Sequence, residues 1–195
     1  MAISFDLPPI RIALYTLVTL FSIVVFGLSI ARIVYTKGLS PWDPLNHGQP
    51  YYDPIVAELI VSTILTVPWS IFVMHTIHKR VERRRVSTFR SELIGLFIIW
   101  VFWLCGAAIA TVTENRGTPG RWGDLSFCWE YKQCRILTTL LAFAWSTWAI
   151  LTFLLVISLI FVTANRALLE PMHGRWDPRA SHYGATQPAP MMGYA

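Results

Sequence analysis

The sequence predicts an all-α integral membrane protein whose fold is an antiparallel bundle of four transmembrane helices. Its composition is 54% hydrophobic and 14% charged, whereas a soluble domain carries about a quarter charged residues. Four stretches of at least 20 residues contain no Asp, Glu, Lys or Arg: residues 12–31, 59–78, 93–113 and 136–165. A helix needs about 20 residues to cross a hydrocarbon core of about 30 Å. Between the second and third stretches, residues 79–90 carry six Lys or Arg and one Glu.

The first span is predicted over residues 10–35. Pro8 and Pro9 precede it closely, and proline is tolerated in the first turn of a helix. The start of the chain is nearly neutral and the apolar run is longer than the core of a cleavable signal peptide, so we interpret it as an uncleaved span. Arg11 and Arg32 lie near its two ends, where we expect their long side chains to reach the lipid headgroups.

The other three spans are predicted over residues 55–78, 92–112 and 136–164. Glu58 falls in the first turns of the second span, where a carboxylate meets the positive end of the helix dipole and still reaches water. Pro68 lies in the middle of that span and predicts a kink. The four spans form one membrane domain, residues 1–166. Residues 167–195 are rich in Pro, Gly, Ala and Ser, which predicts a disordered cytoplasmic tail.

The basic loop between the second and third spans orients the chain, because Lys and Arg near span ends stay on the cytoplasmic side. With this loop inside, ten Lys and Arg residues face the cytoplasm, six lie outside, and both termini are cytoplasmic. We expect a multi-pass protein of the secretory pathway or plasma membrane. Because the basic residues cluster at span ends rather than along a soluble face, membrane topology explains them better than nucleic-acid binding. The residues predicted to contact anionic lipid are Lys79, Arg80, Arg83, Arg84, Arg85 and Arg90.

The same loop contains a candidate phosphorylation site at Ser87. Two arginines precede it in the run Arg84-Arg85-Val86-Ser87, a pattern that basophilic kinases accept. Phosphate would add a charge of about −1.5 to −2 and weaken the attraction to anionic lipid. The pattern is short and common, and its closeness to the membrane is the argument against it.

The sequence predicts no catalytic residue, no cofactor and no metal site, and therefore a protein that is not an enzyme. It lacks the H-E-x-x-H, G-x-S-x-G and phosphate-loop motifs. No charged residue lies in the middle of a span, where transporters and proton relays usually need one. His75, His78 and Glu82 have a spacing that could hold a metal, but the neighbouring arginines would repel a cation. Cys105, in the middle of the third span, is interpreted as a packing residue.

Four tryptophans lie near the middle of the third and fourth spans rather than at the interfaces. Trp100 and Trp103 are three residues apart, as are Trp145 and Trp148, so each pair shares one helix face. Packing within the bundle is one explanation, and a groove for lipid or sterol is the other. Small residues at a spacing of four also predict close helix contacts. These pairs are Gly106 with Ala110 and Ala142 with Ser146.

Cys128 and Cys134 lie in the second external loop, within FCWEYKQCR. That side of the membrane is oxidising in the secretory pathway, so the two cysteines either form a disulfide or remain free thiols. Zinc is not expected, because no histidine lies nearby to complete a site.

Four spans with both ends inside, a short external loop with paired cysteines, and the run LLAFAWSTWAILTFLL together resemble the MARVEL-domain family, particularly its fungal members. The resemblance covers about residues 10–166 and is sharpest from Cys128 to Trp148, including Cys134 and Phe143. Claudins fit worse because their paired cysteines lie in the first external loop. Tetraspanins fit worse because they have a large second loop with a Cys-Cys-Gly motif.

The resemblance implies a non-enzymatic role in organising membrane microdomains, in vesicle trafficking or in membrane apposition. It also implies a disulfide between Cys128 and Cys134. The expected partners are membrane lipids, including sterol and anionic lipid, and further protein subunits in a homo- or hetero-oligomer. The alternative function is a small transporter or channel subunit, whose path would be lined by Glu58, Thr63 and Thr66.

Overall fold

The computed structural model describes residues 7–38, 53–79, 87–111, 132–165, 168–169 and 172. These residues form four helices: α1 (Leu7–Lys37), α2 (Pro54–Lys79), α3 (Phe89–Thr111) and α4 (Lys132–Asn165). All four are long and apolar enough to cross a membrane. The predicted fold class, an all-α bundle of transmembrane helices, is therefore confirmed, and with it the prediction of a multi-pass integral membrane protein.

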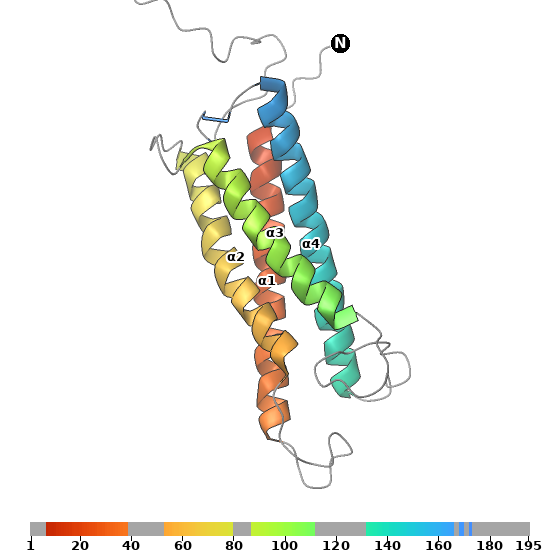
Figure 1. Cartoon of the computed structure of the whole chain (residues 1–195). Coiled ribbons are helices and arrows are strands. Elements are labelled where there is room, and N and C mark those ends of the chain that lie inside the picture. Colours follow the sequence, from red (N-terminus) through yellow and green to blue (C-terminus); the bar gives the residue numbers. More distant parts are fainter. Residues whose placement is uncertain are drawn as a thin grey trace, which may run out of the picture.

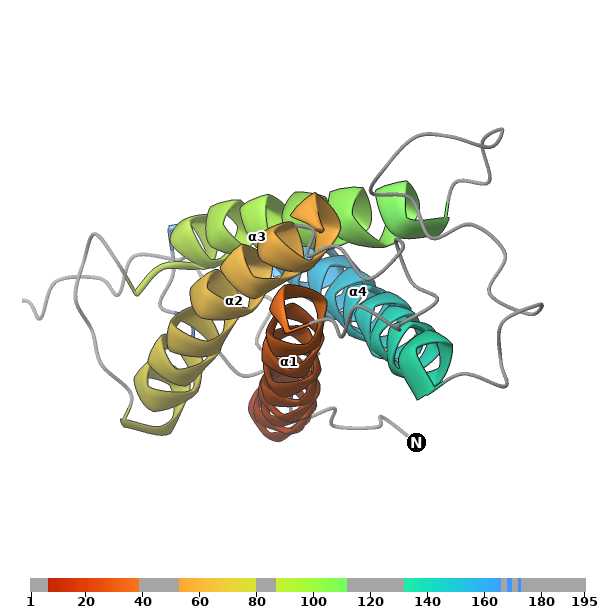
Figure 2. The same ribbon diagram turned by 90° about the horizontal axis from the view of Figure 1, so that it is seen from below.

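Successive helices run in opposite directions, so the starts of α1 and α3 lie at the same end as the last turns of α2 and α4 (Figure 1). Each helix packs against two others: α1 and α3 each contact both α2 and α4. Figure 2 shows that the helices cross at clear angles instead of lying parallel. Because α1 and α3 start at the same end, side chains in their first turns can meet inside the bundle.

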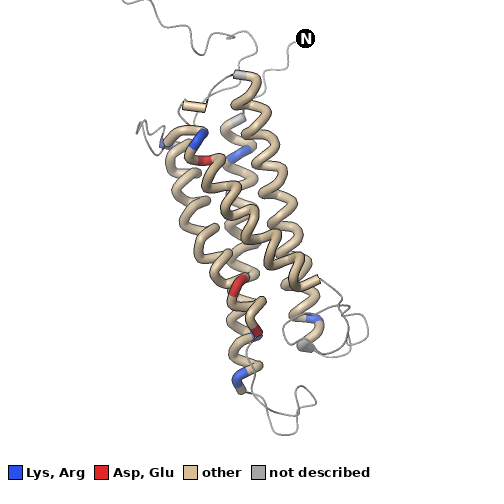
Figure 3. Tube along the Cα trace, in the orientation of Figure 1, with Lys and Arg blue, Asp and Glu red and all other residues tan. Residues whose placement is uncertain are grey.

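The outer surface of the bundle is apolar, as contact with lipid requires. Ile64, Phe97 and Ile160 are each more than half exposed, at 56%, 56% and 55%, whereas Tyr15 and Trp103 are fully buried. Figure 3 shows the charged residues of the described helices gathered toward their ends, with a long uncharged middle. Several serines and threonines are also buried between the helices. The interior is therefore more polar than the surface, the reverse of a soluble bundle.

Side-chain caps set the starts of α2 and α3. Asp53 precedes α2, and its Oδ1 accepts the backbone N–H of Ile55 at 3.2 Å. Thr88 precedes α3, and its Oγ1 lies 3.5 Å from the N–H of Ser91. Such caps satisfy N–H groups that have no partner within the helix. Because of the Thr88 cap, α3 begins at Phe89 and not at residue 92, where the span was predicted to start.

The start of the C-terminal segment differs from the prediction of a disordered tail beginning at residue 167. Leu168 and Met172 are described, and Met172 is fully buried among core residues. The carbonyl of Leu168 accepts the N–H of Arg90 at 3.0 Å, and the N–H of Met172 donates to the carbonyl of Ser87 at 2.9 Å. Composition alone could not reveal these backbone contacts. Residues 173–195 lie outside the described part of the chain.

Candidate functional site

A buried charged cluster joins the first turns of α1 and α3. Arg11 and Glu92 are both fully buried and form a salt bridge between Nη2 and Oε2. Tyr15, one helical turn after Arg11, donates its hydroxyl to the other carboxylate oxygen of Glu92 at 2.9 Å. Both oxygens of Glu92 therefore have donors. A buried charge is tolerated when it is paired and hydrogen-bonded in this way.

Two further contacts extend this cluster to the C-terminal segment and to α4. Arg11 Nη1 donates to the backbone carbonyl of Met172 at 2.7 Å. The guanidinium carbon of Arg11 lies 4.9 Å from the ring centroid of Phe89, a cation–π distance. Phe89 in turn packs on Phe161 of α4, with ring centroids 5.0 Å apart. One arginine thus links α1, α3 and residue 172, while its aromatic neighbour contacts α4.

The expectation that Arg11 and Arg32 reach the lipid headgroups is wrong, because Arg11 is fully buried and Arg32 is 3% exposed. The sequence held a signal that pointed to the Arg11 pairing. Alternate spans start on the same side of a membrane. An arginine in the first turn of one span can therefore meet a glutamate in the first turn of the span two places later. Arg11 and Glu92 fit that rule. This pairing becomes visible only when the charges of different spans are compared.

Of the residues predicted to contact anionic lipid, Lys79 at the end of α2 and Arg90 at the start of α3 lie at this same end of the bundle. Lys79 and Arg90 are exposed. The other four, Arg80, Arg83, Arg84 and Arg85, lie outside the described residues. Ser87, the candidate phosphorylation site, is only 3% exposed, and its carbonyl accepts the N–H of Met172. Phosphorylation of Ser87 stays a prediction, and it would require this buried residue to become exposed.

Trp103 packs within the bundle, which was the first of the two explanations. It is fully buried, and its indole N–H donates to Thr66 Oγ1 on α2 at 2.8 Å. The hydroxyl of Thr66 donates onward to the carbonyl of Ser62 at 2.6 Å. Because a buried indole N–H needs an acceptor, this bond fixes α3 against α2.

Trp100, Trp145 and Trp148 form an aromatic cluster along the contact between α3 and α4, which we call the tryptophan cluster. Trp148 lies 5.7 Å from Trp100 and 5.4 Å from Trp145, measured between ring centroids. Trp100 donates its indole N–H to Thr152 Oγ1 at 2.7 Å. All three tryptophans are only partly buried. They therefore combine helix packing with a face that is open toward lipid.

Two glycines allow α3 to approach α2. A Cβ at Gly95 would overlap the ring of Trp69, and a Cβ at Gly106 would overlap the carboxylate of Glu58. Gly106 and Ala110 are both buried, so this pair lies on a packing face of α3 as expected. The other small pair differs, since Ala142 and Ser146 are exposed on the outer face of α4.

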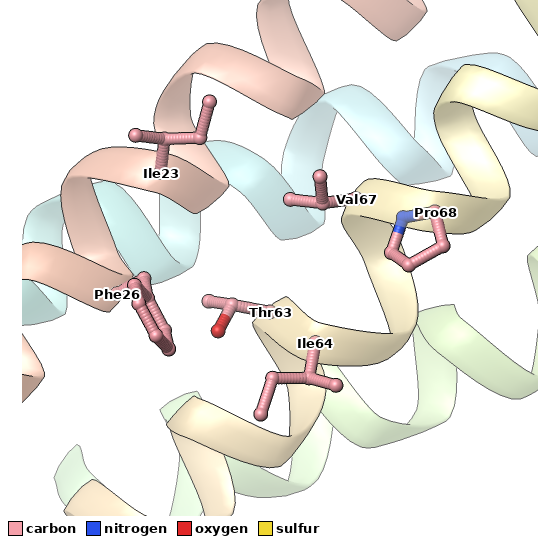
Figure 4. A pocket seen from close by; sticks show the side chains of 6 residues that line it. All are labelled: Ile23, Phe26, Thr63, Ile64, Val67 and Pro68. Atoms are coloured by element: carbon pink, nitrogen blue, oxygen red, sulfur yellow. The ribbon is translucent and has the colours of Figure 1, made fainter.

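Glu58, Thr63 and Thr66, the residues predicted to line a transport path, do not all face the same feature of the bundle. Ser62 donates to Glu58 Oε1 at 2.9 Å, and Thr66 faces Trp103. Thr63 lines a different feature, an apolar pocket of about 310 Å³ between α1 and α2 (Figure 4). The remaining lining residues of this pocket are Ile23, Phe26, Ile64, Val67 and Pro68. The hydroxyl of Thr63 donates to the carbonyl of Ile60 at 2.7 Å, so it is already satisfied.

The cysteines are only partly covered by the described residues. Cys134 is buried near the start of α4, at 8% exposure. Cys128 lies outside the described residues, so the disulfide stays a prediction. Cys105 is a free thiol and is exposed on the outer surface of α3, which differs from the expected packing role. An apolar residue in a span can face either lipid or protein, and hydropathy does not separate the two.

His75 and His78 are exposed near the end of α2, and Glu82 lies outside the described residues. Within the described ranges, no three His, Cys, Asp or Glu side chains lie close enough together to hold a metal.

Comparison of the chain with protein-family models, with curated proteins and with solved structures found no significant match. The MARVEL-domain resemblance therefore remains a hypothesis from the sequence.

Proposed function

We propose that this protein is a non-enzymatic membrane-organising protein that acts in lateral microdomain organisation, vesicle trafficking or membrane apposition. The observation that supports this best is that polar side chains in the described bundle form hydrogen bonds and an ion pair between helices. Arg11, Tyr15 and Glu92 bond to one another, and Trp103 bonds to Thr66. These bonds connect helices and leave a broad apolar surface for lipid. Such a molecule acts through its outer surface and its ends.

Two parts of that outer surface suit lipid contact. At the basic end, Lys79 and Arg90 are exposed and adjoin the arginine-rich loop, so this end suits an anionic leaflet. At mid-depth, the tryptophan cluster presents rigid aromatic faces against which a lipid chain or sterol ring can pack. We further propose that the basic end is cytoplasmic, that both termini lie on that side, and that Cys128 and Cys134 form a disulfide on the other.

The proposal includes self-association or association with other membrane proteins. Ala142 and Ser146 are exposed on α4, where small side chains let another helix approach closely. The MARVEL-domain resemblance implies the same kind of lateral assembly.

Live imaging of a copy tagged after residue 195, before and after sterol extraction, tests this function. Stable patches that disperse on extraction are expected. The double variant Trp145→Leu with Trp148→Leu should reduce patch formation, whereas Phe153→Leu, at a lipid-exposed site on the same helix (53% exposed), should not. A uniform distribution that extraction leaves unchanged would refute a microdomain role.

A small transporter or channel subunit is the second candidate, and one observation favours it. Glu58 Oε2 is buried and has no hydrogen-bond donor among the described residues. The buried hydroxyl of Ser70 on the same helix also has no hydrogen-bond partner among the described residues. Solute flux into liposomes that contain the purified protein tests this candidate, with Glu58→Gln as the matched variant. Flux that the substitution abolishes would favour transport over membrane organisation.

A further inference from the structure

Two described residues that follow α4, Leu168 and Met172, bond to residues at the start of α3 or just before it. We call the described residues of this segment, Leu168, Leu169 and Met172, the latch. The carbonyl of Leu168 accepts the N–H of Arg90 at 3.0 Å. Short blue pieces of this segment are visible near the upper ends of the helices in Figure 1. The latch is therefore hydrogen-bonded to the start of α3, where the basic loop ends.

Met172 is the centre of the attachment. Its side chain is fully buried in the core. Its N–H donates to the carbonyl of Ser87 at 2.9 Å, and its carbonyl accepts from Arg11 Nη1 at 2.7 Å. One residue of the latch therefore bonds to the candidate phosphorylation site on one side and to the buried arginine on the other.

Ser87, whose carbonyl bonds to Met172 of the latch, is only 3% exposed, although the preceding arginines give it a pattern that kinases accept. A kinase must draw the substrate segment into its own active site, which a segment held by a buried neighbour cannot enter. Phosphate on Ser87 would also add a bulky, doubly charged group beside the site of Met172. A docked latch therefore opposes phosphorylation of Ser87, and a phosphate on Ser87 opposes docking of the latch.

We propose that the latch gates phosphorylation of Ser87. After the latch leaves, a basophilic kinase transfers the γ-phosphoryl group of ATP to Ser87 Oγ. The new P–O bond replaces the bond to ADP, and the hydroxyl proton passes to the catalytic base of the kinase. In cells this step rests on the proposed cytoplasmic position of the basic end.

Arg11 would stabilise the open state, in which the latch has left and Ser87 carries a phosphate. When the latch leaves, Arg11 Nη1 loses its acceptor, and Arg11 Nε is already buried without an acceptor among the described residues. Both donors belong to a guanidinium that is linked to Ser87 through the backbone of Met172. Phosphate oxygens on Ser87 would supply acceptors for these donors in charge-assisted hydrogen bonds. Phosphorylation would thus keep the latch from returning.

Initial rates of phosphorylation at Ser87, measured in detergent with a purified basophilic kinase and ATP, test the proposal. Truncation after residue 167 and the point variant Met172→Asp should each raise the rate about tenfold or more, because both remove hydrogen bonds or burial that close the site. Leu169→Asp is the matched control, since it adds the same charge to the latch at a position that is 76% exposed. It should react like the parent chain. Equal rates in all four proteins, or no phosphate at Ser87 in any, would overturn the proposal.

A second measurement does not depend on a kinase. Ser87→Cys should react slowly with a maleimide in the full chain and about tenfold faster after truncation at residue 167. Lys79→Cys, at an exposed position of the same end, should react fast in both. Fast reaction at position 87 in the full chain would refute the latch. Both ends are accessible in detergent, so a wrong membrane orientation would leave these results unchanged and would appear separately in sided labelling of vesicles.

Discussion

Loss of one partner of the Arg11–Glu92 ion pair is expected to destabilise the bundle strongly. Glu92→Gln keeps the side-chain shape but leaves a fully buried guanidinium without its counter-ion. The Met172 carbonyl and the Phe89 ring remain, and they do not carry a compensating charge. Removing one member of a buried pair typically costs about 3–5 kcal/mol. Tyr15→Phe removes only one bond to the carboxylate and should cost about 1.5–3 kcal/mol.

The assay is equilibrium unfolding in mixed micelles, followed by tryptophan fluorescence. A double-mutant cycle of Arg11→Gln and Glu92→Gln should give a coupling energy of about 2 kcal/mol, since the double variant no longer buries an unpaired charge. Arg90→Gln is the matched control: it removes an exposed charge two residues from Glu92 and should change stability by about 0.5 kcal/mol or less.

Two results would contradict the reasoning. A cost below about 1 kcal/mol for Glu92→Gln would mean that Arg11 reaches water or a lipid phosphate and does not depend on Glu92. Strict additivity of the two single substitutions would mean that their side chains do not interact. Either result would return Arg11 to the headgroup role that its position in the sequence suggested.

Three other predictions test separate parts of the structure. Gly95→Ala should destabilise by about 1–3 kcal/mol, because its Cβ overlaps a tryptophan ring of α2; in the same unfolding assay Gly27→Ala, with open space around it, should be neutral or gain up to about 1 kcal/mol. Trp103→Phe should cost about 1–3 kcal/mol by leaving a cavity and removing the bond to α2, and a change under about 0.5 kcal/mol would argue against that bond. Mass spectrometry of unreduced peptides should find Cys128 joined to Cys134, and free thiols at both would refute the disulfide.

The four spans were predictable because the signal for a span is local. Length and freedom from charge decide whether a helix can cross a bilayer, and residues 12–31 or 136–165 show both without reference to the rest of the chain. The limits of α3 were less accurate, because the Thr88 cap is a hydrogen-bonding feature that hydropathy does not register.

The faces of the spans were harder to predict, since lipid and protein neighbours both favour apolar residues. Trp100 and Trp103 share a helix face by spacing, yet Trp103 is fully buried against α2 while Trp100 reaches α4 and stays partly exposed. Cys105 faces outward although it lies among residues of the same character. In a soluble bundle, the alternation of polar and apolar residues would have marked these faces.

The charged cluster explains why the basic end of the described bundle differs from its middle. At mid-depth, packing and neutral hydrogen bonds such as Trp103 to Thr66 hold the helices, and nothing in these contacts depends on the C-terminal segment. At the basic end, Arg11 divides its donors between Glu92, a fixed part of α3, and Met172, a part of the latch. The first bond keeps α1 on α3 when the second is broken. We therefore expect that the latch can open without separating the helices, and that a change in the C-terminal segment would alter the basic end while the apolar outer surface stays as it is.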